Sequence, residues 1–457
     1  MAAEKNVHMT GIGEAARSKV PMNRRLGFWT NSAVLAGFVI VISSLLVGGI
    51  VGANFPPRQA VWLILFAALS NSFVAIFICG IAARTGYSSA LIYRFAYGSK
   101  GSILPNLVMA LTGVGWFAVI VNITRDAFVD LVGIPVDSIG NWISMVVISA
   151  LFVVPAYKSI RWIGYVSWVA VPALLVVLVV VLWKTVGDAG GVSPLFALTK
   201  GSGMGILTGM TIAAGGWLQG ATVSADFARF FKNARASTGG VLLTFGVLVF
   251  IQFAGGAFGA AVTGEWNIFL IVSSFGLVSV TFIALFLGAW STGQAIMYGA
   301  SLQTAAPPIP MWKDQETTRR AAVIILWVAA VVAGSLGIET VMNWWLTLLA
   351  TVIAPIATTV ILDYWAFPSR QKMYESGRSP DTLVNPAALV TWIVGFLVGY
   401  YSGKQNFGVA VINGMIASAI VYYPWMYLTV SRSQRAEQTL QGRQETKAVV
   451  LEGGQSE

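Results

Sequence analysis

Residues 205–232, GILTGMTIAAGGWLQGATVSADFARFFK, are long and apolar enough to cross a bilayer, yet they contain five glycines and a central tryptophan, Trp217. Each glycine costs about 1 kcal/mol relative to alanine in a helix interior. A helix that only anchors a protein in lipid gains nothing from them. A helix whose backbone approaches a ligand, or breaks to expose amide and carbonyl groups, does need them. We interpret this segment as the substrate helix of a membrane transporter.

The composition of the whole chain is typical of a helical membrane protein. Its 457 residues are 56% hydrophobic and 10% charged, with a mean hydropathy of +0.76, whereas soluble domains contain about 25% charged residues. The apolar runs are continuous and not alternating, which indicates helices and excludes a transmembrane β-barrel. At about 20 residues per crossing, the chain has room for about a dozen spans.

Twelve apolar segments are expected to form these spans. They lie at 27–52, 59–83, 103–131, 138–156, 161–185, 204–231, 237–262, 267–300, 319–337, 340–366, 384–402 and 407–431. The transporter domain then occupies residues 27–431. It is preceded by a leader at 1–26 that lacks the pattern of a cleaved signal peptide, and followed by a polar tail at 432–457 that we expect to be disordered.

The basic residues predict the orientation of the spans. Of the 28 Lys and Arg residues, 23 fall on the N-terminal side of the membrane, four on the other side, and one, Arg125, within a span. This excess is the positive-inside pattern, so both termini are expected to be cytoplasmic. The net charge of +10 is explained in this way and requires no nucleic-acid partner. The expected location is the plasma (bacterial inner) membrane.

Two of the segments carry helix-breaking residues at mid-depth. In helix 1 (27–52) these are Gly37, Ser43–Ser44 and Gly48–Gly49, and in helix 6 (204–231) they are Gly215–Gly216. Interrupted helices at matching places of two inverted halves indicate a midplane binding site. We therefore expect helices 1–5 (27–185) and 6–10 (204–366) to form inverted repeats, with helices 11 and 12 (384–431) appended.

Two tryptophans are candidates for binding a flat ligand. Trp116 in helix 3 and Trp217 in helix 6 each lie about 18–20 Å from the start of their helix, near mid-bilayer. Most of the 17 tryptophans are expected to serve the membrane interface or packing. However, Gly115 precedes the first and Gly215–Gly216 the second, which leaves room beside each ring. Two facing indoles could stack on either side of a heteroaromatic base.

Helix 8 carries candidate groups for a cation and for the edge of a base. The adjacent hydroxyls of Ser291 and Thr292, together with carbonyls freed at a helix break, would suit a hard monovalent cation, although such hydroxyls more often bond within their own helix. The Gln294 amide could read a base edge or equally bond to a neighbouring helix. No carboxylate lies beside Trp116 or Trp217, which favours Na⁺ over H⁺ as the coupling ion.

Other ionisable residues have simpler interpretations. Asp226 and Arg229 are three residues apart and can pair as a latch or gate at the cytoplasmic end of helix 6. Glu339 and Asp363 flank helix 10, where we expect interfacial exposure. Cys79 is the only cysteine, and the only histidine lies in the leader. We therefore expect neither a cofactor nor enzymatic activity.

Several motifs resemble the nucleobase:cation symporter-1 family, and within it the bacterial cytosine permeases. They include GGIVGANF at 48–55, VGWF at 114–117, SADFARFFKNA at 224–234, AWST at 289–292 and NWWLTLLATVIAPIATTVILDYW at 343–365. The resemblance implies a LeuT-type fold, in which five-plus-five inverted helices are followed by two more. It also implies uptake of a base together with a cation.

Carried over residue by residue, the resemblance implies a specific site. The base would stack between Trp116 and Trp217 and contact the main chain at Gly216. The implied cation ligands are the carbonyls of Gly37, Ile40 and Gly288 and the hydroxyls of Ser291 and Thr292. Gly113 stands where cytosine permeases have a glutamine that reaches the base, and Gln294 is the one polar residue left where they have Asn-Asp-Asn. A change in selectivity is therefore expected.

The sequence thus predicts an all-α protein of about twelve transmembrane helices that imports a nucleobase (cytosine, a purine or a related flat heterocycle) with a cation, Na⁺ before H⁺, by alternating access. One alternative is proton-coupled uptake of another heterocycle, such as hydantoin, allantoin or a thiamine-precursor pyrimidine. Another is a non-transporting membrane receptor or a channel. The expected partners are the small heterocycle and the lipid bilayer, while the ring identity and the oligomeric state stay open.

Overall fold

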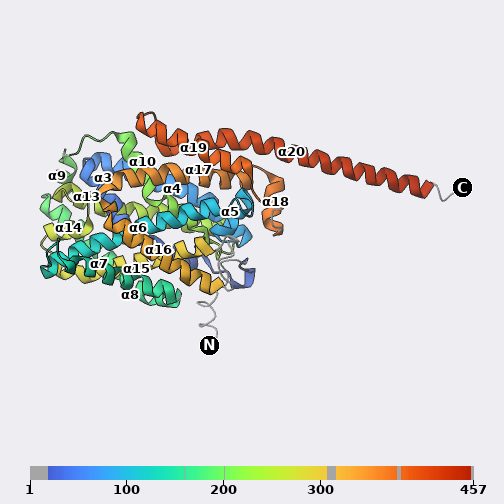
Figure 1. The fold of residues 1–457 in the computed structure, drawn as a ribbon. Coiled ribbons are helices and arrows are strands. Elements are labelled where there is room, and N and C mark those ends of the chain that lie inside the picture. Colours follow the sequence, from blue (N-terminus) through green and yellow to red (C-terminus); the bar gives the residue numbers. More distant parts are fainter. Residues whose placement is uncertain (1–18, 159, 200, 306–314, 378–381, 454–457) are drawn as a thin grey trace.

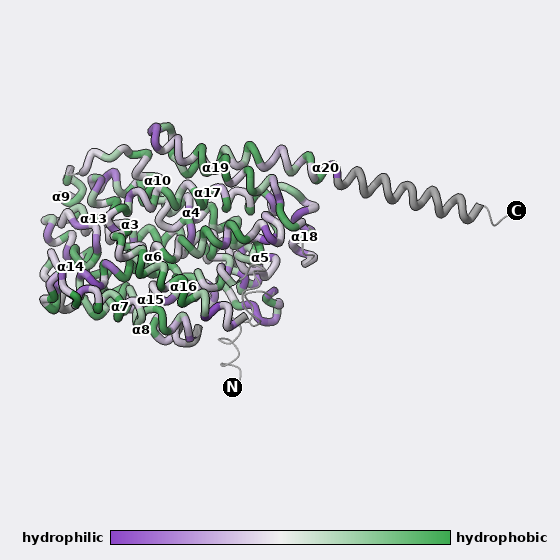
Figure 2. Tube along the Cα trace, in the orientation of Figure 1, coloured by the Kyte–Doolittle hydropathy of each residue, from purple (hydrophilic) through white to green (hydrophobic). Residues whose placement is uncertain are grey.

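The computed structural model describes residues 19–158, 160–199, 201–305, 315–377 and 382–453. The regular structure of these residues is helical (Figure 1), apart from one isolated bridge between Leu26 and Phe231. Apolar residues occur throughout the bundle helices (Figure 2), as expected where both lipid and neighbouring helices contact them.

Length and hydropathy identify ten spans among the described residues. Nine helical segments are long and apolar enough to cross a membrane. They are α4 (Pro57–Thr85), α6 (Ile103–Val132), α7 (Ile139–Lys158), α8 (Ile160–Asp188), α12–η3–α13 (Ala234–Val241, Leu242–Leu248, Val249–Thr263), α16 (Gln315–Ser335), η4–α17 (Ile338–Val341, Met342–Trp365), α19 (Pro386–Lys404) and α20 (Ala410–Gly453). The pair α2 (Phe28–Val39) and α3 (Ile42–Asn54), bent by 56°, makes a tenth.

Two further long helices of the bundle complete the predicted count. These are α10 (Ile206–Val223) and α15 (Val278–Ala305), which fall outside the set of nine. Both carry polar side chains and glycines of the predicted site, which lower their hydropathy without preventing burial inside a bundle. Together with these two, the described residues contain twelve long helical segments, with α2–α3 counted as one, and the all-α fold class is confirmed.

Short helices connect the spans at the two ends of the bundle. At one end lie α5 (Ser89–Tyr97) and α18 (Pro368–Ser376), and at the other lie α9 (Val192–Ala197) and α14 (Ile268–Ser274) (Figure 1). The predicted helix 267–300 is therefore two helices, α14 and α15. The chain turns between them at Gly276, whose φ of 70° favours glycine.

The segment before α2 folds onto the same end of the bundle as α5. It contains the short helix η2 (Met22–Arg24). The main-chain N–H of Val20 donates to the carbonyl of Gly86, directly after α4, at 2.9 Å, and that of Leu26 donates to Phe230 at 2.7 Å. The described part of the predicted leader is thus bound to the C-terminal ends of α4 and of helix 6.

The predicted break in helix 1 is present, but its position differs from that of several predicted breaker residues. The helix stops at Val39 and resumes at Ile42. Gly48, by contrast, lies inside α3, where an added methyl group would collide with the main chain of Phe253 on α13. Its role is close helix packing, which small residues permit in membrane proteins.

The predicted break of helix 6 at Gly215–Gly216 is wrong. Helix α10 continues through both residues to Val223, and Ser224 then leads into the short helix α11 (Ala225–Ala228). A methyl group at Gly215 would collide with the carbonyl of Leu346, and one at Gly216 would lie 2.6 Å from Val47. These glycines allow neighbouring helices to approach and do not interrupt their own helix.

The C-terminal tail, predicted to be disordered, is helical in the structure at residues 432–453. Helix α20 runs to Gly453 and extends beyond the bundle (Figure 1). The segment is rich in Ala, Leu, Gln, Glu, Lys and Arg, which are strong helix formers, so a polar composition does not prevent a helix. Residues 454–457 lie outside the described chain.

Candidate functional site

The interruption of helix 1 frees main-chain polar groups from the hydrogen bonds of a continuous helix. Ile40 and Val41 adopt extended conformations, with φ/ψ of −77°/90° and −142°/154°. The last bond of α2 joins the Ile40 N–H to the carbonyl of Ala36 at 2.8 Å. The next two N–H groups, of Val41 and Ile42, would bond to Gly37 and Phe38 in a continuous helix. Here they bond to side chains of other helices.

The first of these side chains is Gln252 on α13. Its Oε1 accepts from the Val41 N–H at 3.1 Å, and its Nε2 donates to the Val39 carbonyl at 3.2 Å. The residue is 4% exposed. Sequence reasoning did not select Gln252, although a single amide within the apolar run VLVFIQFAGGAF was a usable signal.

The second is Thr292 on α15, one of the predicted cation residues. Its hydroxyl accepts from the Ile42 N–H at 3.3 Å and donates to the Gly288 carbonyl at 2.7 Å. The carbonyl of Gly288 keeps a second lone pair for another partner. Thr292 therefore joins the start of α3 to the main chain of α15.

Ser291, the neighbouring predicted cation residue, faces a different helix. Its hydroxyl lies 2.9 Å from that of Ser167 on α8. A methyl group at Gly288 would collide with Leu174, also on α8. Around Gly37, by contrast, an added methyl group would meet no atom within 4 Å. The structure thus brings Thr292 and Gly288 to the break of helix 1 and sets Ser291 against α8.

Trp116 lies in the buried middle of α6, with 4% of its surface exposed. A methyl group at Gly115 would collide with the ring of Trp345 on α17, and one at Gly113 would lie 3.0 Å from Ala300 on α15. The glycines around Trp116 therefore admit α17 and α15. Trp345 was missed in the sequence because a tryptophan near the start of a span is usually interfacial.

Trp217 belongs to an aromatic cluster around helix 1. Its indole N–H donates to the hydroxyl of Ser44 on α3 at 2.8 Å. Its ring packs edge-on against Phe38 and Phe245, with centroid distances of 5.6 and 5.5 Å, and a methyl group at Gly220 would collide with it. Among the described ring contacts, none joins Trp217 directly to Trp116.

Helices α6 and α10 meet the same short stretch of α17. Gly115 on α6 contacts Trp345, and Gly215 on α10 contacts the adjacent residue, Leu346. The backbones next to Trp116 and Trp217 therefore approach adjacent residues of α17. Gln294 on α15, the predicted reader of a base edge, is fully buried in the bundle.

Asp226, predicted to pair with Arg229, binds another helix. Its carboxylate accepts from the main-chain N–H of Ser89 at 2.8 Å and from the Ser89 hydroxyl at 3.1 Å. That hydroxyl accepts in turn from the Gln303 amide of α15 at 2.8 Å. Arg229 donates through Nε to the main-chain carbonyl of Asp226 at 3.1 Å. The contact thus links α11, α5 and α15.

The predicted interfacial exposure of Asp363 is wrong, because this residue is completely buried. Arg370 on α18 donates to both carboxylate oxygens at 2.8 Å. Tyr374 on α18 and Tyr422 on α20 each donate to the carboxylate at 2.7 Å. Four donors compensate the burial of the charge. Glu339, at the other end of the span, is partly buried and accepts from an amide on α6.

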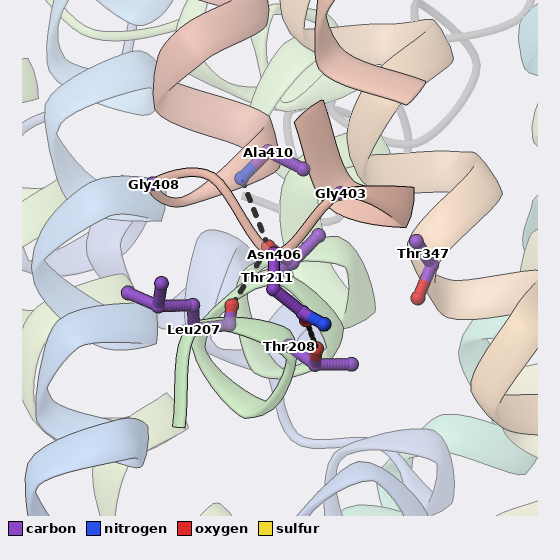
Figure 3. A pocket seen from close by; sticks show the side chains of 8 residues that line it. All are labelled: Leu207, Thr208, Thr211, Thr347, Gly403, Asn406, Gly408 and Ala410. Atoms are coloured by element: carbon purple, nitrogen blue, oxygen red, sulfur yellow. Dashed lines mark hydrogen bonds between the residues drawn. The ribbon is translucent and has the colours of Figure 1, made fainter. Parts of the chain in front are cut away.

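A surface pocket lies at the N-terminal ends of α10, α17 and α20 (Figure 3). Its lining includes Thr208, Thr211 and Asn406, and the Thr211 hydroxyl accepts from the main-chain N–H of Ala410 at 3.2 Å. None of the predicted substrate or cation residues lines this pocket. Its polar groups bond to one another and close the turn between α19 and α20.

A bundle of this kind, with buried polar groups converging on one interrupted helix, defines a membrane transporter and not a simple anchor. Comparison with known proteins identifies its family. A family model for permeases for cytosine/purines, uracil, thiamine and allantoin matches residues 19–424. The chain therefore belongs to this family, the nucleobase:cation symporter-1 family.

Two relatives are similar over nearly their whole length. The cytosine permease of Escherichia coli (strain K12) is 25% identical over 409 residues, which cover 89% of this chain and 93% of the relative. The hydantoin permease of Microbacterium maritypicum is 24% identical over 459 residues, covering 92% and 91%.

Solved structures confirm the LeuT-type fold. Mhp1, a nucleobase-cation-symport-1 family transporter, in a closed conformation with bromovinylhydantoin bound, matches with a TM-score of 0.73 and 20% identity, covering 91% of this chain and 96% of that one. Its inward-facing conformation gives 0.74 and 19%, covering 91% and 94%. A Na⁺-coupled sialic acid symporter gives 0.56 and 13%, covering 86% and 95%.

Proposed function

We propose that this transporter imports a nucleobase, or a related flat heterocycle, together with Na⁺ by alternating access. Membership of the permease family supports a small heterocyclic substrate. Relatives named cytosine permease and hydantoin permease place such rings among the substrates to be tested first.

The observation that carries the proposal is the contact between Thr292 and the break of helix 1. The Thr292 hydroxyl lies 3.3 Å from the main-chain nitrogen of Ile42 and 2.7 Å from the carbonyl of Gly288. Gly37 and Ile40 lie just before that nitrogen along the chain. Two of the five predicted cation residues, Gly288 and Thr292, are thus joined by a hydrogen bond beside the break, and two more, Gly37 and Ile40, belong to the end of α2 and to the break itself.

The chemistry of these groups favours Na⁺. Carbonyl and hydroxyl oxygens are neutral, and rings of such oxygens can replace the hydration shell of a monovalent cation. Protein sites for divalent cations generally include carboxylates. The groups that contact the break, from Gln252, Thr292 and the main chain, are amide, hydroxyl and carbonyl. None of them titrates near neutral pH, so none offers a site for a coupled proton.

The surroundings of Trp116 support a flat ring as substrate. Base–aromatic stacking contributes about 1–3 kcal/mol per base. Gly113, one turn before Trp116, has no side chain with which to read a base edge. The buried indole N–H of Trp345 has no acceptor among the described residues, so it is a candidate donor to the ring. A donor in a new place agrees with an altered selectivity within the family.

Thermal stabilisation of the purified protein by a panel of rings tests this proposal. The panel contains cytosine, uracil, adenine, guanine, hypoxanthine, hydantoin and allantoin, each in Na⁺ and in choline at the same ionic strength. We expect one ring to raise Tm more in Na⁺ than in choline. Trp116→Ala should abolish the shift, whereas Trp183→Ala, which removes an exposed indole from α8, should keep it.

The outcomes separate the parts of the proposal. Equal stabilisation in Na⁺ and choline would contradict coupling to Na⁺ but would still support a flat ring as the substrate. No stabilisation by any ring would contradict the substrate class. Loss of the shift in both tryptophan variants would show that stability, and not stacking, underlies the effect of Trp116.

A further inference from the structure

Gln252 is a buried amide whose two ends both act on the interrupted part of helix 1. Its Oε1 accepts from the N–H of Val41 at 3.1 Å, and its Nε2 donates to the carbonyl of Val39 at 3.2 Å. The side chain therefore brackets Ile40 from both sides. Nε2 also lies 3.2 Å from the carbonyl of Leu248 in its own helix, which fixes the rotamer.

These two bonds substitute for two bonds of a continuous helix. In an α-helix the Val41 N–H would bond to the carbonyl of Gly37, and the Val39 carbonyl would accept from an N–H four residues later. A side chain inserted into this ladder is one of the few known causes of a sharp bend. Gln252 is such a side chain, and it lies four residues after the π-helix η3, an element frequent at functional sites.

The consequence is that main-chain oxygens are released at the break. The Gly37 carbonyl loses its helical donor because Gln252 takes the Val41 N–H. Among the hydrogen bonds of the described residues, none is donated to the carbonyl of Ile40. A buried carbonyl without a donor, such as that of Ile40, is costly, so a residue that keeps it in this state must be compensated elsewhere. A bound cation provides such compensation.

We propose that Gln252 is a positioning residue of the cation site. It holds helix 1 open at Ile40, so that the carbonyls of Gly37 and Ile40 stay available to the ion, and it does not itself bind the ion. This inference rests on the proposed function and goes beyond it, because it assigns the geometry of the site to α13. Thr292 holds the other side of the break through Ile42.

The test is the half-saturating Na⁺ concentration for binding of the stabilising ring, in purified wild type and variants. Gln252→Met removes both bonds at similar volume, whereas Gln252→Glu keeps an oxygen that accepts from Val41. We expect Gln252→Met to raise the half-saturating Na⁺ concentration about tenfold. The affinity for the ring at saturating Na⁺ should stay within about twofold. Gln252→Glu should cause a rise of less than about threefold.

Asn122→Leu is the matched control. Asn122 is also a fully buried amide with two bonds to other elements, at 2.8 Å to the Gly334 carbonyl and at 2.7 Å to Glu339. It lies on α6, away from helix 1. Its variant should lower Tm as Gln252→Met does and leave the half-saturating Na⁺ concentration unchanged.

A wild type that depends on Na⁺, with the same half-saturation in Gln252→Met, would overturn this inference and leave the proposed function intact. An equal rise of the half-saturating Na⁺ concentration in Asn122→Leu would also overturn the inference. If Gln252→Met does not fold, Gln252→Glu decides, and a tenfold rise in that variant would contradict the role given to Val41. A wild type indifferent to Na⁺ would overturn both the coupling ion and this inference.

Discussion

The carboxylate of Asp226 binds the first residue of α5, accepting from the main-chain N–H of Ser89 at 2.8 Å and from its hydroxyl at 3.1 Å. The carboxylate thereby satisfies a free N–H at a helix N-terminus, where negative charge is favourable. Since Asp226 follows the end of α10, this contact ties the C-terminal end of helix 6 to the segment between α4 and α6. Helix 6 cannot move away from that loop without breaking it.

We expect Asp226→Ala to loosen this contact. The native cysteine reports on it, because Cys79 on α4 is buried and its sulfur lies 3.0 Å from the hydroxyl of Ser224, two residues before Asp226. Loss of hydrogen bonds to a charged group should raise the rate of Cys79 alkylation by a maleimide about tenfold or more. Mass spectrometry of the intact protein measures the rate.

Asp188→Ala serves as the control, since Asp188 is a half-exposed residue that pairs with Lys184 at the other end of the bundle. Its alkylation rate should equal that of the wild type. An unchanged rate in Asp226→Ala would show that the contact with Ser89 does not hold this end of the bundle closed.

Substitutions of Thr292 should distinguish the contribution of its hydroxyl to Na⁺-dependent binding from that of its side-chain shape. Thr292→Val keeps the volume but removes the acceptor for the Ile42 N–H and the donor to Gly288. We expect it to abolish the dependence of ring binding on Na⁺, whereas Thr292→Ser should retain that dependence within about threefold. Titration of Na⁺ at fixed ring concentration checks this. Full Na⁺ dependence in Thr292→Val would show that the Thr292 hydroxyl is not part of the cation site.

The bond between Trp217 and Ser44 should be detectable as a coupling. Trp217→Phe and Ser44→Ala each remove the 2.8 Å hydrogen bond and leave most of the packing with Phe38 in place. Each should destabilise the protein by about 1 kcal/mol, and the double variant should cost little more than either single one. Thermal unfolding of the four proteins completes the cycle. Additive losses would mean that the bond contributes nothing of its own.

The buried charge of Asp363 should matter for stability. Asp363→Asn leaves Arg370 buried without its ion pair, a loss of about 3–5 kcal/mol in comparable cases. We expect Tm to fall by about 10 °C and to recover partly in the double variant with Arg370→Met. Asp126→Asn, which breaks an exposed pair with Arg125, should change Tm by about 1 °C or less. Equal shifts in Asp363→Asn and Asp126→Asn would refute the buried network.

Much of the fold follows from the sequence because lipid imposes simple rules. Runs of about 20 apolar residues, loops with prolines and the sided distribution of Lys and Arg together predict the spans. The breakers in helix 1 also predicted an interruption there. Glycine alone could not place it, since Gly48 serves close packing against Phe253 while Ile40, an ordinary apolar residue, stands in the break.

The parts that could not be predicted depend on partners far away in the sequence. Gln252 acts on residues more than 200 positions earlier, and a single amide in an apolar helix does not reveal its partner. Asp363 resembles an interfacial carboxylate until Tyr422, 59 residues later, is placed beside it. Gly215 permits the approach of Leu346, so the same residue type that suggested a broken helix marks a tight contact instead.

Uptake into proteoliposomes tests the central claim most directly. The protein is reconstituted with an inward Na⁺ gradient, an inward proton gradient, or neither, and uptake of the stabilising ring is followed with a labelled form. We expect accumulation above the external concentration with the Na⁺ gradient alone, and its loss in Thr292→Val. Accumulation driven by the proton gradient in the absence of Na⁺, or equilibration without accumulation under every gradient, would contradict Na⁺-coupled import.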